Sequence, residues 1–137
     1  MVEYFVSHGL WGDDRGVGPC QGVGFVDSGG NLVAGVLLHG WQPDAGVMEI
    51  SAFSLTRRWL TRGRLAEVFD YVFGQIGCQM AVARISERNA VARRFWTAMG
   101  ADEFVIPRLR GRDEAEVIST LTAEKWRDFI ARGVGKG

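Results

Sequence analysis

Cysteine is scarce in this chain, and the spacing of its two cysteines excludes a common kind of metal site. Cys20 and Cys78 lie far apart and form neither a Cys-x-x-Cys pair nor a Cys/His cluster. A structural zinc site requires such a cluster, so we predict no metal centre. We expect both thiols to be reduced and buried, as is usual for a cytoplasmic protein.

Long apolar runs and targeting signals are also missing. No stretch is apolar over the roughly 20 residues that a membrane-spanning helix needs, and the N-terminus lacks the basic and apolar segments of a signal peptide. We therefore expect a cytoplasmic protein with no membrane partner. The 137 residues, 47% of them hydrophobic, suffice for one core. We predict a single domain over residues 1–132 and a flexible tail over 133–137.

Positive charge is almost absent from the first 54 residues, although the net charge of the whole chain is zero. Arg15 is the only base in that part, whereas the segment from Arg57 to Arg112 is rich in arginine. The planar guanidinium group forms paired hydrogen bonds with phosphate oxygens. The arginine-rich segment fits a binding site for a phosphate-bearing ligand. It fits solvated helix faces with surface ion pairs equally well.

Turn residues divide the first part of the chain into three predicted strands. Residues 21–27 and 32–38 are joined by Ser28-Gly29-Gly30-Asn31, which is a strong hairpin signal. A second turn, 41–46, leads into a third strand at 47–53. We expect these strands to form an antiparallel meander.

The remainder of the chain alternates helices with strands. Between Arg62 and Ile76 the apolar residues recur every three or four positions, which indicates an amphipathic helix that ends at Gly77. The other predicted elements are a central apolar strand at 79–85, a helix at 90–99 ended by Gly100, strands at 103–106 and 116–121 around a charged hairpin, and a short final helix from Thr122. This order indicates a layered α/β or α+β domain.

The junction between the third strand and the first helix carries a pattern suited to phosphate, because backbone N–H groups at a helix N-terminus attract anions. The segment Arg58-Trp59-Leu60-Thr61-Arg62-Gly63 resembles the pyrophosphate loop of the GNAT acetyltransferase superfamily, Gln/Arg-x-x-Gly-x-Gly/Ala. Arg58 fills the first position and Gly63 the last, while Thr61 stands where the family usually has its first glycine.

A second motif follows the next strand. Asn89 is followed by Ala92, Trp96 and Gly100, at the offsets where the family typically has Asn, Ala, Tyr and Gly. The resemblance implies that Asn89 meets the pantetheine arm or fixes the loop beside it, and that Ala92 lets the helix approach the cofactor. The family's tyrosine often protonates the leaving thiolate. The indole of Trp96 cannot replace it.

The resemblance implies a mixed, mostly antiparallel sheet of about six strands flanked by helices, and binding of acetyl-CoA or another acyl-CoA. Only about twenty residues precede the first hairpin. Members of the family have a strand and two helices there, which form one side of the acceptor-binding site. With this abbreviated N-terminal region, we expect an open acceptor side or one completed by a second subunit in a homodimer. A narrower likeness, to compact acetyltransferase-like proteins of bacterial phages, involves residues 39–41, 57–62 and 106–112.

The catalytic candidates lie on the second and third strands. Glu49, among apolar neighbours that partly desolvate it, is the expected general base, acting through a water; a solvent-facing structural glutamate is the alternative. His39 is a candidate proton relay or a structural hydrogen-bonding group. Ser51 is a candidate for orienting the acceptor. Family-like geometry would separate the third strand from its neighbour, so that backbone N–H groups there polarise the thioester carbonyl.

The residues expected to contact the acyl-CoA are drawn from the third strand and from both motifs. Arg93 and Arg94 are candidates for the adenosine 3′-phosphate, or for salt bridges on a helix face. The full set is Ile50, Ser51, Ala52, Arg58, Trp59, Leu60, Thr61, Arg62, Gly63, Asn89, Ala92, Arg93 and Trp96.

Three functions stay open at this point. The first is an N-acyltransferase that acts from acetyl-CoA on a primary amine of a small molecule or protein. The second is a phage-type enzyme that modifies nucleic-acid bases, although zero net charge argues against strong binding to DNA. The third is a non-catalytic acyl-CoA-binding or assembly protein, which Trp96 motivates.

Overall fold

The computed structural model describes residues 2–10, 19–27, 29, 32–54 and 62–133, with side chains placed for 29, 35–51 and 66–133.

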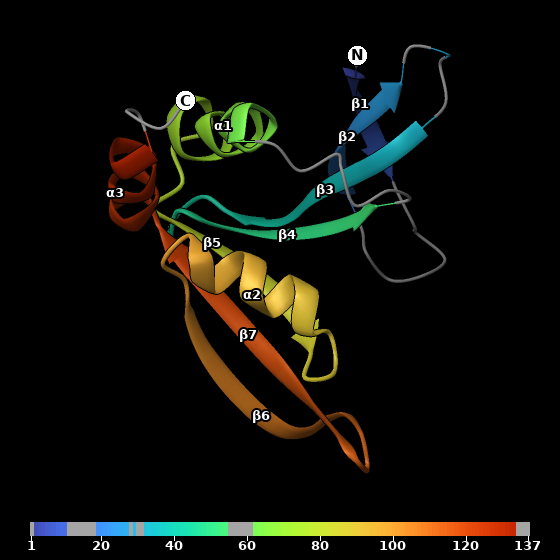
Figure 1. Ribbon diagram of the computed structural model, residues 1–137, viewed down its shortest axis with the longest axis vertical. Helices are drawn as coiled ribbons and strands as arrows, with labels where there is room; N and C mark the ends of the chain where they lie inside the picture. Colours follow the sequence, from blue (N-terminus) through green and yellow to red (C-terminus); the bar gives the residue numbers. More distant parts are fainter. Residues whose placement is uncertain (1, 11–18, 28, 30–31, 55–61, 134–137) are drawn as a thin grey trace.

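The strands of the described residues form one mixed sheet of seven, in the order β1-β2-β3-β4-β5-β7-β6 (Figure 1). Neighbouring strands are antiparallel except β4 and β5, which are parallel. The expected meander and the central position of the strand after the first helix are thereby confirmed. The strands are β1 (Val2–Leu10), β2 (Pro19–Asp27), β3 (Leu32–Gln42), β4 (Val47–Ser54), β5 (Met80–Ser86), β6 (Asp102–Gly111) and β7 (Glu114–Thr122).

The sheet has one strand more than the sequence predicted. β1 pairs along its whole length with β2, from Val2 opposite Asp27 to Leu10 opposite Pro19. The signal for it was present, because residues 2–6 are rich in β-branched and aromatic types that favour strands. The strand and two helices that usually precede the first hairpin in the GNAT family are thus represented, in the described residues, by this strand alone.

The helices begin and end close to the predicted positions. α1 (Arg62–Asp70) continues into a π-helical segment, η2 (Tyr71–Gln75), and α2 (Ala90–Ala98) follows β5. α3 (Ala123–Gly133) closes the described chain. Gly77 and Gly100 have φ angles of 84° and 103°, in the left-handed region that glycine adopts most readily. Both therefore terminate helices, as the sequence predicted.

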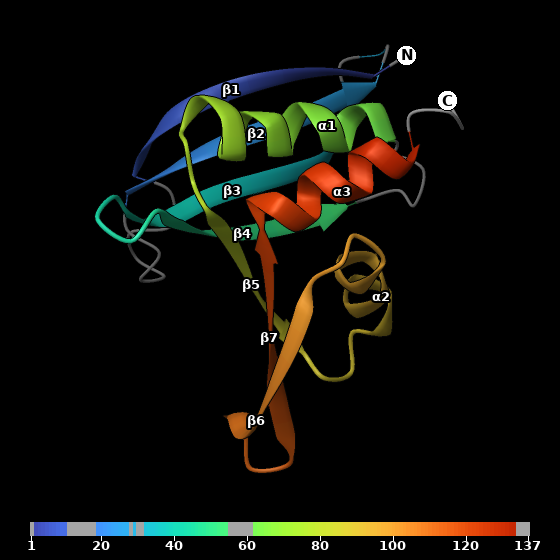
Figure 2. The same cartoon turned by 90° about the vertical axis from the view of Figure 1, so that its left-hand side faces the viewer.

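A single hydrophobic core lies on one face of the sheet. In β5, Ala81, Ala83 and Ile85 are buried and alternate with more exposed residues. All helical segments contribute side chains to the same buried cluster, so the described helices share this face. In Figure 2, α1 and α3 lie in front of the strands. Phe69 of α1 contacts both Trp96 of α2 and Trp126 of α3.

The opposite face of the sheet carries the polar positions that alternate with the core. They include His39 and Glu49, which are opposite each other in the β3–β4 register, and Arg84 on β5. No helix within the described ranges packs on this face, since their buried side chains belong to the core cluster. The β6–β7 hairpin projects from the rest of the domain (Figure 1). We refer to this uncovered side of the sheet as the open face.

Candidate functional site

The central feature of the candidate site is the separation of β4 from β5. The parallel pairing covers three rungs, from Val47 opposite Met80 to Glu49 opposite Val82. β4 continues to Ser54 and β5 to Ser86 without further pairing between them. The backbone groups that Ile50 and the following residues direct toward β5 therefore have no ladder partner there. Such groups must find a partner, and an extended amide-bearing ligand can supply one.

Three of the predicted polar residues meet beside this separation. His39 Nε2 lies 2.8 Å from Ser51 Oγ and 3.7 Å from Glu49 Oε2. The side chains of His39 and Glu49 are 13% and 29% exposed, so both are accessible to a ligand while partly shielded from water. The sequence placed these residues on neighbouring strands. The β3–β4 register, with His39 opposite Glu49 and Leu37 opposite Ser51, brings them together.

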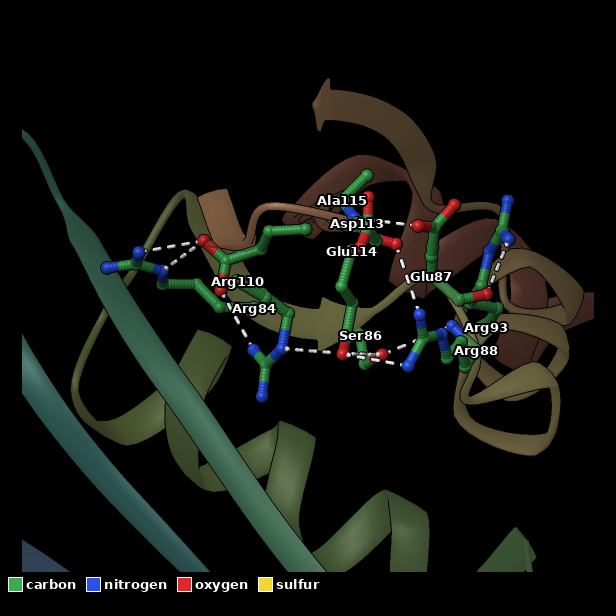
Figure 3. A network of polar contacts seen from close by, with 10 residues as sticks. Arg84, Ser86, Glu87, Arg88, Arg93, Arg110, Asp113, Glu114 and Ala115 are labelled. Atoms are coloured by element: carbon green, nitrogen blue, oxygen red, sulfur yellow. Dashed lines mark hydrogen bonds and ion pairs between the residues drawn. The ribbon is translucent and has the colours of Figure 1, made fainter. Parts of the chain in front are cut away.

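An arginine that sequence reasoning did not single out lies on the same face. Arg84 donates from Nε and Nη2 to Oε2 of Glu116, at 2.9 and 2.7 Å. Glu116 is buried, with 4% of its side chain exposed, and its other oxygen accepts a hydrogen bond of 3.0 Å from Arg110 Nη1. Figure 3 shows the two guanidinium groups on either side of the carboxylate. One signal was present in the sequence, namely a charged residue within an otherwise apolar central strand.

The electrostatics of this arrangement favour the charged forms of Arg84 and Glu116. The hydrogen bonds from Arg84, more than its charge, lower the pKa of Glu116 below its ordinary range, despite burial. The same hydrogen bonds raise the pKa of Arg84. A buried carboxylate is stable only when it is paired in this way. Glu116 is thus an anion that fixes the position of two arginines.

The remaining members of the network lie at the turn end of the β6–β7 hairpin. Arg88 Nη1 lies 3.3 Å from Glu114 Oε1, and the hydroxyl of Ser86 donates to the other oxygen of that carboxylate. Glu87 accepts a 2.7 Å hydrogen bond from the backbone N–H of Ala115 (Figure 3). The charged hairpin that the sequence predicted is therefore tied to β5 and to the residues after it through ion pairs and hydrogen bonds.

The second motif is mostly explained by local structure. The Asn89 side chain caps α2, because its Oδ1 accepts from the backbone N–H of Ala92 at 3.1 Å. Ala92 packs against the core. Trp96 is 6% exposed and meets Phe69 edge-on, with ring centroids 5.6 Å apart. Core packing accounts for Trp96 without a ligand, and contact of these residues with an acyl-CoA stays a prediction.

Arg93 forms a salt bridge, which the sequence analysis gave as the alternative to contact with the adenosine 3′-phosphate. Its Nε and Nη2 donate to the two oxygens of Glu103, both at 3.0 Å, and its Nη1 donates to the carbonyl oxygen of Glu87. This hydrogen bonding lowers the pKa of Glu103. An adenosine 3′-phosphate would have to compete with Glu103 for this guanidinium.

The predicted pyrophosphate loop is described only at its end. Arg58, Trp59, Leu60 and Thr61 lie outside the described residues, and Ala52, Arg62 and Gly63 are described by backbone alone. That backbone places Arg62 and Gly63 in the first turn of α1, in the connection that follows β4. The N-terminus of α1 is thus where the loop motif requires a helix start.

Other predicted features can be stated briefly. Cys78 is a buried free thiol whose pKa is raised by that burial, while the Cys20 side chain lies outside the described set. Within the described ranges, no cluster of His, Cys, Asp and Glu side chains is arranged to hold a metal ion. No helix in that part of the chain is long and apolar enough to cross a membrane.

Comparison with known proteins gives matches in structure and none in sequence. No protein-family model matches the chain, and no curated protein matches it. Solved acetyltransferase structures do. The spermidine/spermine N-acetyltransferase SpeG from Vibrio cholerae, in complex with manganese ions, superposes with a TM-score of 0.72 at 13% identity, over 92% of this chain and 96% of that one.

Two further structures give similar values. A presumed acetyltransferase matches with a TM-score of 0.70 at 14% identity over 82% of this chain, which spans 64% of that protein's length. The dodecameric spermidine N-acetyltransferase from Vibrio cholerae matches with a TM-score of 0.67 at 15% identity, over 78% of this chain and 67% of that one. Likeness at these identities concerns the fold. The mixed sheet, the separated parallel strands and these structural matches together show that the chain has the GNAT acetyltransferase fold.

Proposed function

We propose that this protein is an N-acyltransferase that transfers an acetyl group from acetyl-CoA to a primary amine by direct attack. The observation that carries the proposal is the separation of β4 from β5 directly after the Glu49–Val82 pair. It leaves unpaired backbone groups beside a histidine, a carboxylate and a hydroxyl on the open face. The structural neighbours named as polyamine N-acetyltransferases make amines the first class of acceptor to consider.

Acetyl-CoA would bind as a substrate along the edge of β4. Its pantetheine amides would hydrogen-bond to the backbone of Ile50, Ser51 and Ala52, which β5 does not pair. Its pyrophosphate would lie at the N-terminus of α1, where backbone N–H groups attract anions. Arg58, Arg62 and Gly63 are the proposed contacts there.

The reaction would proceed by attack of the neutral amine nitrogen on the thioester carbonyl carbon. The C–N bond forms as the C–S bond breaks, and coenzyme A leaves as a thiolate. Backbone N–H groups of β4 polarise the carbonyl oxygen. Glu49 accepts the amine proton, directly or through a water, and His39 relays it outward. The thiolate takes its proton from solvent, because the indole of Trp96 has no acidic proton to give.

An assembly of copies would complete the site. β6 is an edge strand, and its Phe104, Val105 and Ile106 are 56, 54 and 38% exposed. Exposed apolar side chains on an edge strand favour association. A homodimer built in this way would give the open face a second wall, and one of the structural neighbours is a dodecamer.

One observation favours a second candidate, a protein that binds acyl-CoA without transferring the acyl group. Trp96 stands at the position of the family's usual acid and is buried in the core. A protein without this acid could keep the binding site and lose turnover.

Release of free thiol from acetyl-CoA distinguishes the two candidates. We expect thiol release by the purified protein to rise with the concentration of added primary amine, and the acetylated amine to appear in the mass spectrum. Binding of acetyl-CoA with no release above background across amines of different charge would instead support the non-catalytic candidate. Transfer to a DNA oligonucleotide with none to free amines would support a nucleic-acid acceptor.

A further inference from the structure

Arg84 occupies a position on the open face that the proposed chemistry leaves without a role. The last β4–β5 rung joins Glu49 to Val82, and Arg84 is the next residue of β5 on the same face. Neighbours on one face of a strand are about 6.5 Å apart along it. Arg84 therefore follows Glu49 along the strand direction, at the point where β4 and β5 separate.

The guanidinium of Arg84 is held in place but remains accessible. Its Nε and Nη2 are fixed on Glu116, while Nη1 makes no hydrogen bond within the described part of the chain. The side chain is 48% exposed, although its partner carboxylate is only 4% exposed. Because a buried anion sets its position, Arg84 presents free donors with little further loss of side-chain entropy.

The ion pairs around Arg84 leave one edge of its guanidinium group unoccupied. Arg84 and Arg110 both pair with Glu116, and Arg110 and Arg88 pair with Glu114 (Figure 3). Within the described residues, Glu49 is a further carboxylate that acts on Arg84, through space. An anion bound at the unoccupied edge of Arg84 would therefore lie beside the reaction site.

We propose that Arg84 binds an anionic group, a carboxylate or a phosphate, on the acceptor amine. This inference rests on the proposed acyltransferase function and names its substrate class. The reacting nitrogen would lie near Glu49, and the anion would lie on the free edge of the Arg84 guanidinium. A diamine or polyamine would place its second ammonium group against Arg84, where like charges repel. The acceptor class is therefore a zwitterionic amine.

Acetyl transfer to four short primary amines tests this assignment: aminobutanoate, aminopropyl phosphate, butylamine and diaminobutane. We expect kcat/KM to be highest for aminobutanoate or aminopropyl phosphate, the two amines that carry an anion. The ratio of their kcat/KM values shows which anion is preferred. In Arg84→Gln, kcat/KM for that acceptor is expected to fall about 10- to 100-fold, the value of one charged hydrogen bond. Transfer to butylamine is expected to change little.

Arg110→Gln is the matched control, because it removes the other arginine from the same carboxylate and leaves Arg84 on the open face. Its acceptor preference is expected to stay that of the wild type, with thermal melting used to verify that both variants are folded. A wild-type preference for diaminobutane, or an anion preference that survives Arg84→Gln, would overturn the role assigned to Arg84. Either result would leave the proposed acyltransferase function standing. Failure to bind acetyl-CoA or to acetylate any amine would overturn it together with the proposed function.

Discussion

Replacing Glu49 with glutamine is expected to lower the rate of acetyl transfer by about 10²- to 10⁴-fold, the usual contribution of a general base. Glutamine preserves the size of the side chain but cannot accept the amine proton. Glu49 lies 3.7 Å from His39 and forms the last β4–β5 pair with Val82. Because the binding groups on β4 are backbone groups, the Kd for acetyl-CoA is expected to remain within a few fold of the wild-type value. Initial rates and calorimetry measure the two quantities.

Glu124→Gln makes the same chemical change on the exposed surface of α3. We expect this variant to transfer acetyl groups at the wild-type rate. A Glu49→Gln protein as active as the control would show that Glu49 is not the base. A structural role for Glu49 would lower stability in step with activity, so the thermal melting of both variants is compared as well.

Replacing Phe69 with alanine is expected to lower the free energy of unfolding by about 3–5 kcal/mol, the usual cost of removing a buried aromatic ring. Phe69 is 3% exposed. Its ring centroid lies 5.6 Å from that of Trp96 and 4.9 Å from that of Trp126. One side chain therefore connects α1 with α2 and α3, and its loss removes much of a total stability of about 5–15 kcal/mol. Urea denaturation measures the change.

Val91→Ala is the comparison for this prediction, since Val91 lies on α2 but is 65% exposed. Its effect is expected to stay within about 0.5 kcal/mol. A loss below about 1 kcal/mol in Phe69→Ala would contradict the account of a single core shared by the helices. A Phe69→Ala protein too unstable to purify would agree with the account of a shared core. Phe69→Leu would then be measured instead, with a smaller expected loss in the free energy of unfolding.

The order of elements could be predicted because their signals are local. The periodicity between Arg62 and Ile76 indicated α1, and the positive φ angles of Gly77 and Gly100 follow from their role as helix stops. β6 and β7 proved longer than predicted, since the charges of residues 108–114 indicated a loop. Edge strands tolerate charged residues because one side faces solvent, and Arg108, with a φ of 66°, takes up the irregularity in the pairing.

The candidate site was predictable where it depends on neighbouring strands. His39 and Glu49 follow from the hairpin that joins β3 and β4. The hydrogen bonds between Arg84 and Glu116 depend on the pairing of β5 with β7. The chain passes through α2 and β6 between these two strands. Nothing in the local sequence around Arg84 identifies a partner thirty-two residues away. Trp96 was assigned from its motif position, and only the packing of three helices places its ring in the core.

Titration of the purified protein with acetyl-CoA in a calorimeter tests the central claim most directly. Gly63→Glu is the matched variant, because it puts a negative side chain in the first turn of α1, where the pyrophosphate is proposed to bind. The account predicts micromolar-range binding by the wild type and loss of that binding in the variant, with unchanged thermal stability. Absence of binding by the wild type, or equal binding by both proteins, would contradict the proposed acetyl-CoA site.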